Sequence, residues 1–156
     1  MRIRRVPRAW LDDPGSIPTG RPGPPRGRPS VGAARNETIV RTVLEAFRQD
    51  DTDTVRQLVA PDARLHIAEP CEGPGDFLGA QDVAERFARS SELLGPDATV
   101  HINDVLASDS RAAVLFEVRD RGTRGSCAQR VAVYRLSRGR ITEIRVHQEP
   151  GGALNA

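Results

Sequence analysis

Side chains of three chemical types alternate in the segment GRITEIRVHQEP near the end of the chain. Arg145, His147 and Glu149 are spaced two apart, so in a regular β-strand they project from one face, while Ile144 and Val146 project from the other. An imidazole and a carboxylate can take up and return a proton, and a guanidinium can stabilise the negative charge that forms. The spacing leaves two interpretations: this face is solvated surface, or it lines a cavity in which the three groups act together.

Other strand-like segments carry further polar candidates. Glu117 and Arg119 share one face of RAAVLFEVRD, and His66 lies in the middle of RLHIAE. A carboxylate with apolar neighbours loses hydration, which raises its pKa toward the range useful for proton transfer. Each candidate also has a structural alternative: an exposed ion pair for Glu117 with Arg119, a hydrogen-bonded structural histidine for His66, and a core position for Tyr134.

The cysteines and histidines do not have the spacing of a metal site. Cys71 and Cys127 form no Cys-x-x-Cys pair, and His66, His101 and His147 are scattered along the chain. We therefore expect no metal and no cofactor, and we expect the two cysteines to be small buried or half-buried residues rather than a disulfide.

Charge is unevenly distributed along the 156 residues. All 23 basic residues are Arg, and residues 1–34 carry a net charge of +5, against −3 for the rest. A nucleic-acid groove needs clustered positive charge and stacking aromatics, so the sequence makes nucleic acid an unlikely partner for the body of the chain. There is no run of about 18 apolar residues and no apolar segment behind the basic N-terminus, which predicts a cytoplasmic protein without a membrane partner.

Composition divides the chain into three parts. Residues 1–34 hold seven of the twelve prolines and are predicted to be a disordered or extended tail. Residues 35–150 are predicted to form one domain, and residues 151–156 a flexible C-terminus.

The domain is expected to open with three helices. NETIVRTVLEAFRQDD has apolar residues at helical spacing and Asn36 as its expected N-cap. DTDTVRQLVAPDA predicts a second helix capped by Asp51 or Thr52 and stopped by Pro61. AQDVAERFARSSELLG predicts a third helix with Phe87 on its inward side.

Five strand-like segments complete the domain. The first is RLHIAE (64–69), followed by a predicted loop, EPCEGPGDFLG, that precedes the third helix. The other four are residues 98–108, 111–120, 126–137 and 140–149, and their short links predict an antiparallel meander. Helices followed by a meander indicate an α+β fold with the helices gathered on one face of a curved sheet.

Three stretches carry a family resemblance. VRTVLEAFRQDDTDTVRQLVAPDARLHI, FLGAQDVAERF and RGRITEIRVHQE are similar to the opening helices, the start of the third helix and the closing strand of the SnoaL-like polyketide cyclase family. That family belongs to the nuclear-transport-factor-two-like superfamily, with ketosteroid isomerases and limonene-type epoxide hydrolases. The resemblance covers residues 35–150 and implies a cystatin-like α+β barrel, a cone of mostly antiparallel sheet around a pocket closed by three N-terminal helices.

The resemblance also implies where the closing strand faces. Arg145, His147 and Glu149 would point into the pocket or toward its mouth, and the other face of the sheet would meet a partner subunit in a homodimer. Glu149 matches the position where the family often has an Asp acting as acid or base. This scaffold hosts many functions, so the family does not fix the reaction.

The resemblance and the residues together predict a cofactor-independent cyclase or isomerase that transfers protons on a hydrophobic, polyketide-like or carbonyl-containing molecule. The expected site is His147 and Glu149 as acid and base, Glu117 or His66 assisting, and Arg119, Arg145, Tyr134 and Phe87 contacting the substrate. Two alternatives stay open. One is epoxide opening by Glu117, Arg119 and Glu149, in imitation of the limonene-type enzymes; the other is a non-catalytic ligand-binding or dimerisation module.

Overall fold

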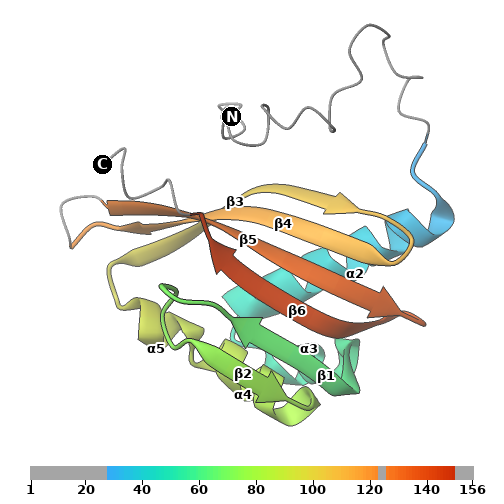
Figure 1. Ribbon diagram of the computed structural model, residues 1–156, viewed down its shortest axis with the longest axis horizontal. Coiled ribbons are helices and arrows are strands. Elements are labelled where there is room, and N and C mark those ends of the chain that lie inside the picture. Colours follow the sequence, from blue (N-terminus) through green and yellow to red (C-terminus); the bar gives the residue numbers. More distant parts are fainter. Residues whose placement is uncertain (1–27, 123–125, 150–156) are drawn as a thin grey trace, which may run out of the picture.

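Helices lie together on one side of a curved six-stranded sheet (Figure 1). The computed structural model describes residues 28–122 and 126–149. Most of the predicted tail and the predicted flexible C-terminus therefore lie outside the described residues. The arrangement confirms the α+β class and the cone-like sheet expected from the sequence.

The first described helix begins earlier than predicted. Helix α2 (Val31–Arg48) is capped by Ser30, whose Oγ accepts a hydrogen bond from the Ala33 backbone N–H at 3.0 Å. The expected cap, Asn36, lies inside the helix, where it is buried and its Nδ2 donates to the carbonyl of Ser108 at 2.9 Å. Helix formation extends into the predicted tail because the Ser30 side chain caps the first turn, and this turn tolerates Gly32.

Helix α3 (Thr52–Leu58) is capped by Asp51, as expected, with its Oδ1 accepting from the Thr54 backbone N–H at 3.1 Å. The helix ends at Leu58, before Pro61, because the chain enters the first strand at Val59.

The predicted third helix is two helices, α4 (Ala80–Ala88) and α5 (Ser90–Leu94). The Ser90 hydroxyl bonds the carbonyl of Arg86, and such local bonds compete with the helical ladder. The second helix ends at Gly95, whose φ of 91° suits glycine.

The strand bounds are β1 (Val59–Ile67), β2 (Gly75–Leu78), β3 (Ala98–Ala107), β4 (Arg111–Asp120), β5 (Ser126–Ser137) and β6 (Arg140–Gln148). Their order in the sheet is β2-β1-β6-β5-β4-β3. The last four form the predicted antiparallel meander, and β1 pairs in parallel with β6. Strand β2 replaces part of the predicted loop, because the free edge of β1 offers it a ladder with Phe77 opposite Leu65.

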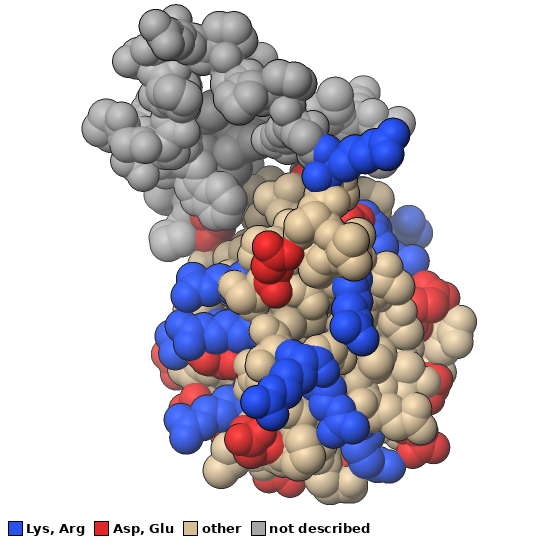
Figure 2. All heavy atoms as spheres, turned by 90° about the vertical axis from the view of Figure 1, so that its right-hand side faces the viewer, with Lys and Arg blue, Asp and Glu red and all other residues tan. Residues whose placement is uncertain are grey.

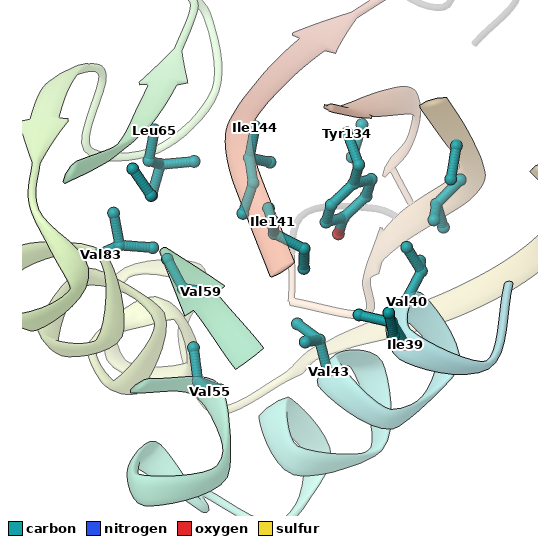
Figure 3. Packing of buried hydrophobic residues seen from close by; sticks show 14 of the residues in the cluster. Ile39, Val40, Val43, Val55, Val59, Leu65, Val83, Tyr134, Ile141 and Ile144 are labelled. Carbon is teal, nitrogen blue, oxygen red and sulfur yellow. The ribbon is translucent and has the colours of Figure 1, made fainter. Parts of the chain in front are cut away.

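The core lies between α2, α3, α4 and the concave face of the sheet (Figure 3). Val40 and Val43 of α2 are fully buried, and they face Ile141 and Ile144 of β6 and Tyr134 of β5 in the figure. Burying a Val or Ile side chain stabilises a fold by roughly 1.5–3 kcal/mol, so these contacts fix which face of the sheet the helices cover.

One end of the molecule is rich in Arg. Figure 2 shows Arg side chains with acidic ones between them on the end of the molecule that lies at the right in Figure 1. Arg111, Arg135, Arg138 and Arg140, near the β3–β4 and β5–β6 turns, are all exposed. Within residues 28–122 and 126–149, no helix is both long and apolar enough to cross a membrane.

Candidate functional site

A hollow of about 120 Å³ lies inside the cone. Its walls are mostly apolar and come from α2, α4, α5 and the inner face of the sheet. Representative lining residues are Leu65, Ile67, Phe87, Ile102, Phe116 and Val146. Ligand pockets typically combine such walls with a few convergent polar groups, so this hollow is the candidate site.

The closing strand turns its apolar face toward this hollow. Ile144 is buried and Val146 lines the hollow, whereas Arg145 and His147 are exposed on the outer face of the sheet. The expectation that Arg145 and His147 point inward is therefore wrong. Burying two branched aliphatic side chains is favourable, and burying a guanidinium and an imidazole costs free energy, so the alternation resolves this way.

The last carboxylate follows the same parity. Glu149 is half-buried and does not line the hollow, and its backbone N–H bonds the carbonyl of Gln129 at 2.9 Å. The expectation that Glu149 points into the pocket is therefore wrong, and its other expected place, at the mouth, stays a prediction. The preceding residue, Gln148, projects to the opposite side of the strand, and its Oε1 accepts a hydrogen bond from Arg130, which lines the hollow.

His66 also lies on the outer face, directly opposite Arg145 in the β1–β6 ladder. Its Nδ1 is 2.7 Å from the Asp76 carboxylate, and its ring lies 6.1 Å from that of His147. The structure thus brings His66, His147 and Arg145 together on the outer surface, away from the hollow. Their predicted roles in proton transfer stay predictions, and none of the three side chains lines the hollow.

Glu117 and Arg119 pair with each other, as one of the two interpretations expected, but Glu117 is fully buried, so the pair is not the exposed one of that interpretation. The Arg119 Nη2 donates to the Glu117 Oε2 at 2.9 Å, and this hydrogen bond raises the pKa of Arg119. The Glu117 side chain is fully buried, yet it projects from the face opposite Phe116 and Val118, which line the hollow. The pair is therefore outside the hollow.

Two of the predicted contact residues do line the hollow. Phe87 comes from α4, and Tyr134 comes from β5 and is 2% exposed. Burial raises the pKa of the Tyr134 hydroxyl, so it stays a neutral donor. Within the described residues this hydroxyl has no hydrogen-bond partner in the protein.

The polar end of the hollow consists of residues that the sequence did not single out. Arg130, only 8% exposed, places its Nη1 at 2.7 Å from the Glu72 Oε2. Its Nε and Nη2 both donate to the Gln148 Oε1, at 3.2 and 3.1 Å. The position of Arg130 on the same face as Ala132 and Tyr134 was the one signal available for it; Glu72 lies in a segment without periodicity.

Arg86 forms the other wall of this polar end. Its Nη2 donates to the backbone carbonyl of Glu72 at 2.6 Å and its Nη1 to the Ser90 hydroxyl at 2.8 Å. Its guanidinium carbon also lies 5.8 Å from the centre of the Phe77 ring, within cation–π distance. Arg86 is only 9% exposed, and these contacts hold its buried side chain in place.

Charge and burial set the protonation state of this end. Burial raises the pKa of Glu72, but the bond from Arg130 and the charges of Arg130 and Arg86 outweigh it, so the pKa of Glu72 lies below its usual value. Burial raises the pKa of the Cys71 thiol, which is beside them and lines the hollow. Neutral solution therefore leaves a carboxylate and a thiol here. The described residues contain no cluster of three His, Cys, Asp or Glu that could hold a metal.

Comparison with solved structures shows which fold this is. An NTF2-like protein of unknown function from Mesorhizobium loti superposes with a TM-score of 0.66 at 16% identity, covering 78% of this chain and 97% of the other. Bal32a, from a soil-derived mobile gene cassette, gives 0.66 at 24% identity, covering 76% and 92%. A "putative ketosteroid isomerase" from Kribbella flavida gives 0.61 at 14% identity, covering 75% and 79%. At these identities the likeness concerns the fold alone.

A family model supplies the second comparison. The model of the SnoaL-like domain matches residues 40–144, from the middle of α2 to the middle of β6. No curated protein matches the sequence.

Proposed function

Because this chain belongs to the SnoaL-like domain family, we propose that it binds a hydrophobic carbonyl compound in the cone and transfers a proton on it without a cofactor. The proposal places Glu72 as the proton carrier, with Arg130 and Tyr134 as hydrogen-bond donors to the carbonyl oxygen. The reaction class is that of a cyclase or isomerase.

One observation carries the proposal: the Glu72–Arg130 ion pair lies at the polar end of a hollow whose other walls are mostly apolar. Taking two charges out of water costs several kcal/mol per ion, and apolar residues of similar volume are often as stable or more stable. A polar pair in such a place is therefore poorly explained by stability. A ligand that uses both groups explains it.

The chemistry follows from the charge states. Glu72 is ionised, so it can accept a proton from the carbon next to a carbonyl group. Donors aimed at the carbonyl oxygen stabilise the enolate that forms, and Arg130 has the charge and Tyr134 the free hydroxyl for this role. When Arg130 donates hydrogen bonds to the ligand oxygen, the ion pair between Arg130 and Glu72 weakens. The pKa of Glu72 then rises, and Glu72 becomes a stronger base.

Non-catalytic binding is the second candidate, and the same ion pair favours it. A carboxylate with a lowered pKa, held at 2.7 Å by a guanidinium, is a weak base as long as the pair persists. Epoxide opening has less support, because Glu117, Arg119 and Glu149 lie outside the hollow and Glu72 is the single acid among its described lining residues.

Hydrogen exchange separates catalysis from binding. We expect the protein to speed the exchange of the α-hydrogens of 2-tetralone with deuterated water, followed by NMR. The Glu72→Gln variant should lose this activity by about 100-fold or more, the usual contribution of a positioned base. The matched controls, His147→Ala and Glu149→Gln on the outer face, should keep it. Bound ketone without accelerated exchange would leave a binding protein, and activity retained in Glu72→Gln would remove Glu72 from the mechanism.

We also propose that the outer face of the sheet joins two copies of the chain. Leu106, 47% exposed, lies opposite Ala113, which lies opposite Val133. Leu115 and Val131 form the next row along the same strands. The first row of this apolar stripe crosses three strands and the second crosses two, with Asp104 of β3 opposite Leu115. A self-complementary sheet face suits a symmetric dimer.

A further inference from the structure

The polar end of the hollow carries more positive than negative charge. Among the described residues that line the hollow, Arg48, Arg86 and Arg130 are cationic and Glu72 is the single acid. Arg86 and Arg130 are both more than nine-tenths buried, and Arg48 is exposed. Of these two buried guanidinium groups, Arg130 forms an ion pair with Glu72, and Arg86 forms no ion pair with a carboxylate of the described residues.

Hydrogen-bond capacity is also left over. A guanidinium has five N–H donors. Arg86 uses one for the Glu72 carbonyl and one for Ser90, and its buried Nε has no partner in the described part of the chain. Buried donors are normally satisfied, and a buried donor left unpaired costs free energy, so this arrangement points to a missing acceptor.

The guanidinium groups of Arg86 and Arg130 both contact the same residue. Arg86 and Arg130 both contact Glu72, one at its backbone carbonyl and the other at its carboxylate. Burial lowers the pKa of Arg86 most, and the positive charges of Arg89 and, to a smaller extent, Arg130 lower it further, while the negative charge of Glu72 raises it. An anion between them would relieve this repulsion.

We propose that the ligand is a hydrophobic carboxylate whose carboxylate group lies between Arg86 and Arg130, while its apolar part fills the hollow. This inference rests on one part of the proposed function, namely that a ligand binds in the hollow. A guanidinium binds a carboxylate through paired, charge-assisted hydrogen bonds, which fits the free donors of Arg86. A second carboxylate beside Glu72 also disfavours the ionised form of Glu72, which makes it a better base.

A pair of naphthalene compounds tests the charge of the ligand directly. 2-Naphthoate and 2-acetonaphthone share one ring system, and the first is an anion where the second is a neutral ketone. Titration calorimetry with the full chain should show naphthoate binding at least tenfold more tightly, as expected for charge-assisted bonds in a dry site. Equal affinities would overturn this inference and leave the carbonyl-binding proposal intact. Binding of neither compound would overturn both.

Substitution of Arg86 supplies the second arm. Arg86→Gln should weaken naphthoate binding about tenfold and leave acetonaphthone within twofold, and Arg86→Lys should keep part of the preference for the anion. The control is Arg145→Gln, which removes an exposed charge on the outer face. An equal loss of both compounds in Arg86→Gln would show that Arg86 only supports the fold. If that variant is unfolded by circular dichroism, the comparison on the unmodified chain decides alone.

Discussion

Arg130 is the residue that organises the polar end of the hollow. It holds Glu72 with one nitrogen and Gln148 with two others, and it comes from the middle of the sheet rather than from a loop. Its side chain is 7% exposed and that of Glu72 is 40% exposed. The pair is therefore partly open to the hollow, where a ligand can reach it, while its cationic partner is fixed by the strand.

Removing only one partner of this pair should destabilise the protein. We expect Arg130→Met to lower the free energy of unfolding by roughly 1–3 kcal/mol, below the 3–5 kcal/mol of fully buried pairs because Glu72 keeps some solvent. The double variant Glu72→Gln with Arg130→Met should recover most of the loss, since no unpaired carboxylate remains. Urea denaturation measures both. A double variant no more stable than Arg130→Met would show that Arg130 stabilises the fold by packing rather than by pairing.

Strand β6 shows how one element separates two environments. From Ile144 to Gln148 its alternate residues go to the inside of the cone and to the outer surface, and the parallel ladder places Ile144 opposite Leu65 and Val146 opposite Ile67. A shift of one residue would exchange all of them, so the buried aliphatic side chains decide the position of every polar one. That is why His147 lies outside although its neighbour Val146 lines the hollow.

The same alternation predicts unequal tolerance to charge. Val146→Asp should lower the free energy of unfolding by about 2–4 kcal/mol, because it replaces an aliphatic side chain in the apolar wall of the hollow by a carboxylate that loses hydration there. His147→Asp, one residue along, should change it by less than about 0.5 kcal/mol, as is usual for exposed sites. Denaturant titration of the two variants gives the comparison. Similar losses in both would contradict the assignment of Val146 to the inside of the cone and His147 to its outer face.

At the scale of the whole molecule, the sheet has two faces with different tasks. The concave face closes over the helices and the hollow, and the convex face carries the stripe of Leu106, Ala113, Leu115, Val131 and Val133. The end seen in Figure 2 carries Arg side chains with acidic ones between them. A second copy of the chain is therefore expected on the convex face and not at that end.

A new charge in the stripe should separate the copies. We expect the protein to sediment as a dimer at micromolar concentration, and Leu115→Arg to sediment as a monomer, because two guanidinium groups would meet near the symmetry axis. Thr38→Arg adds the same charge at an exposed position of α2 and should leave the dimer intact. A monomeric parent protein, or a dimer that survives Leu115→Arg, would contradict this arrangement.

The sequence by itself determined the elements and their class. Alternation over 98–108, 111–120, 126–137 and 140–149 predicted the meander almost to the residue, because strand period and short turns are local properties. Strand β2 was missed because it forms by pairing with the edge of β1, whereas two other details failed through local competitions. Ser30 caps α2 in place of Asn36, and Ser90 accompanies the break between α4 and α5.

Only the tertiary structure decided which side of each strand is inside. Alternation places the side chains of a strand on two faces, and β4 and β5 carry apolar side chains on both. The helices pack against the face that buries more aliphatic surface, and this packing decides which face is inside. The polar end of the hollow was out of reach for a different reason. Glu72, Arg86, Arg130 and Gln148 come from a loop, a helix and two strands, and such a meeting is fixed by topology rather than by any spacing along the chain.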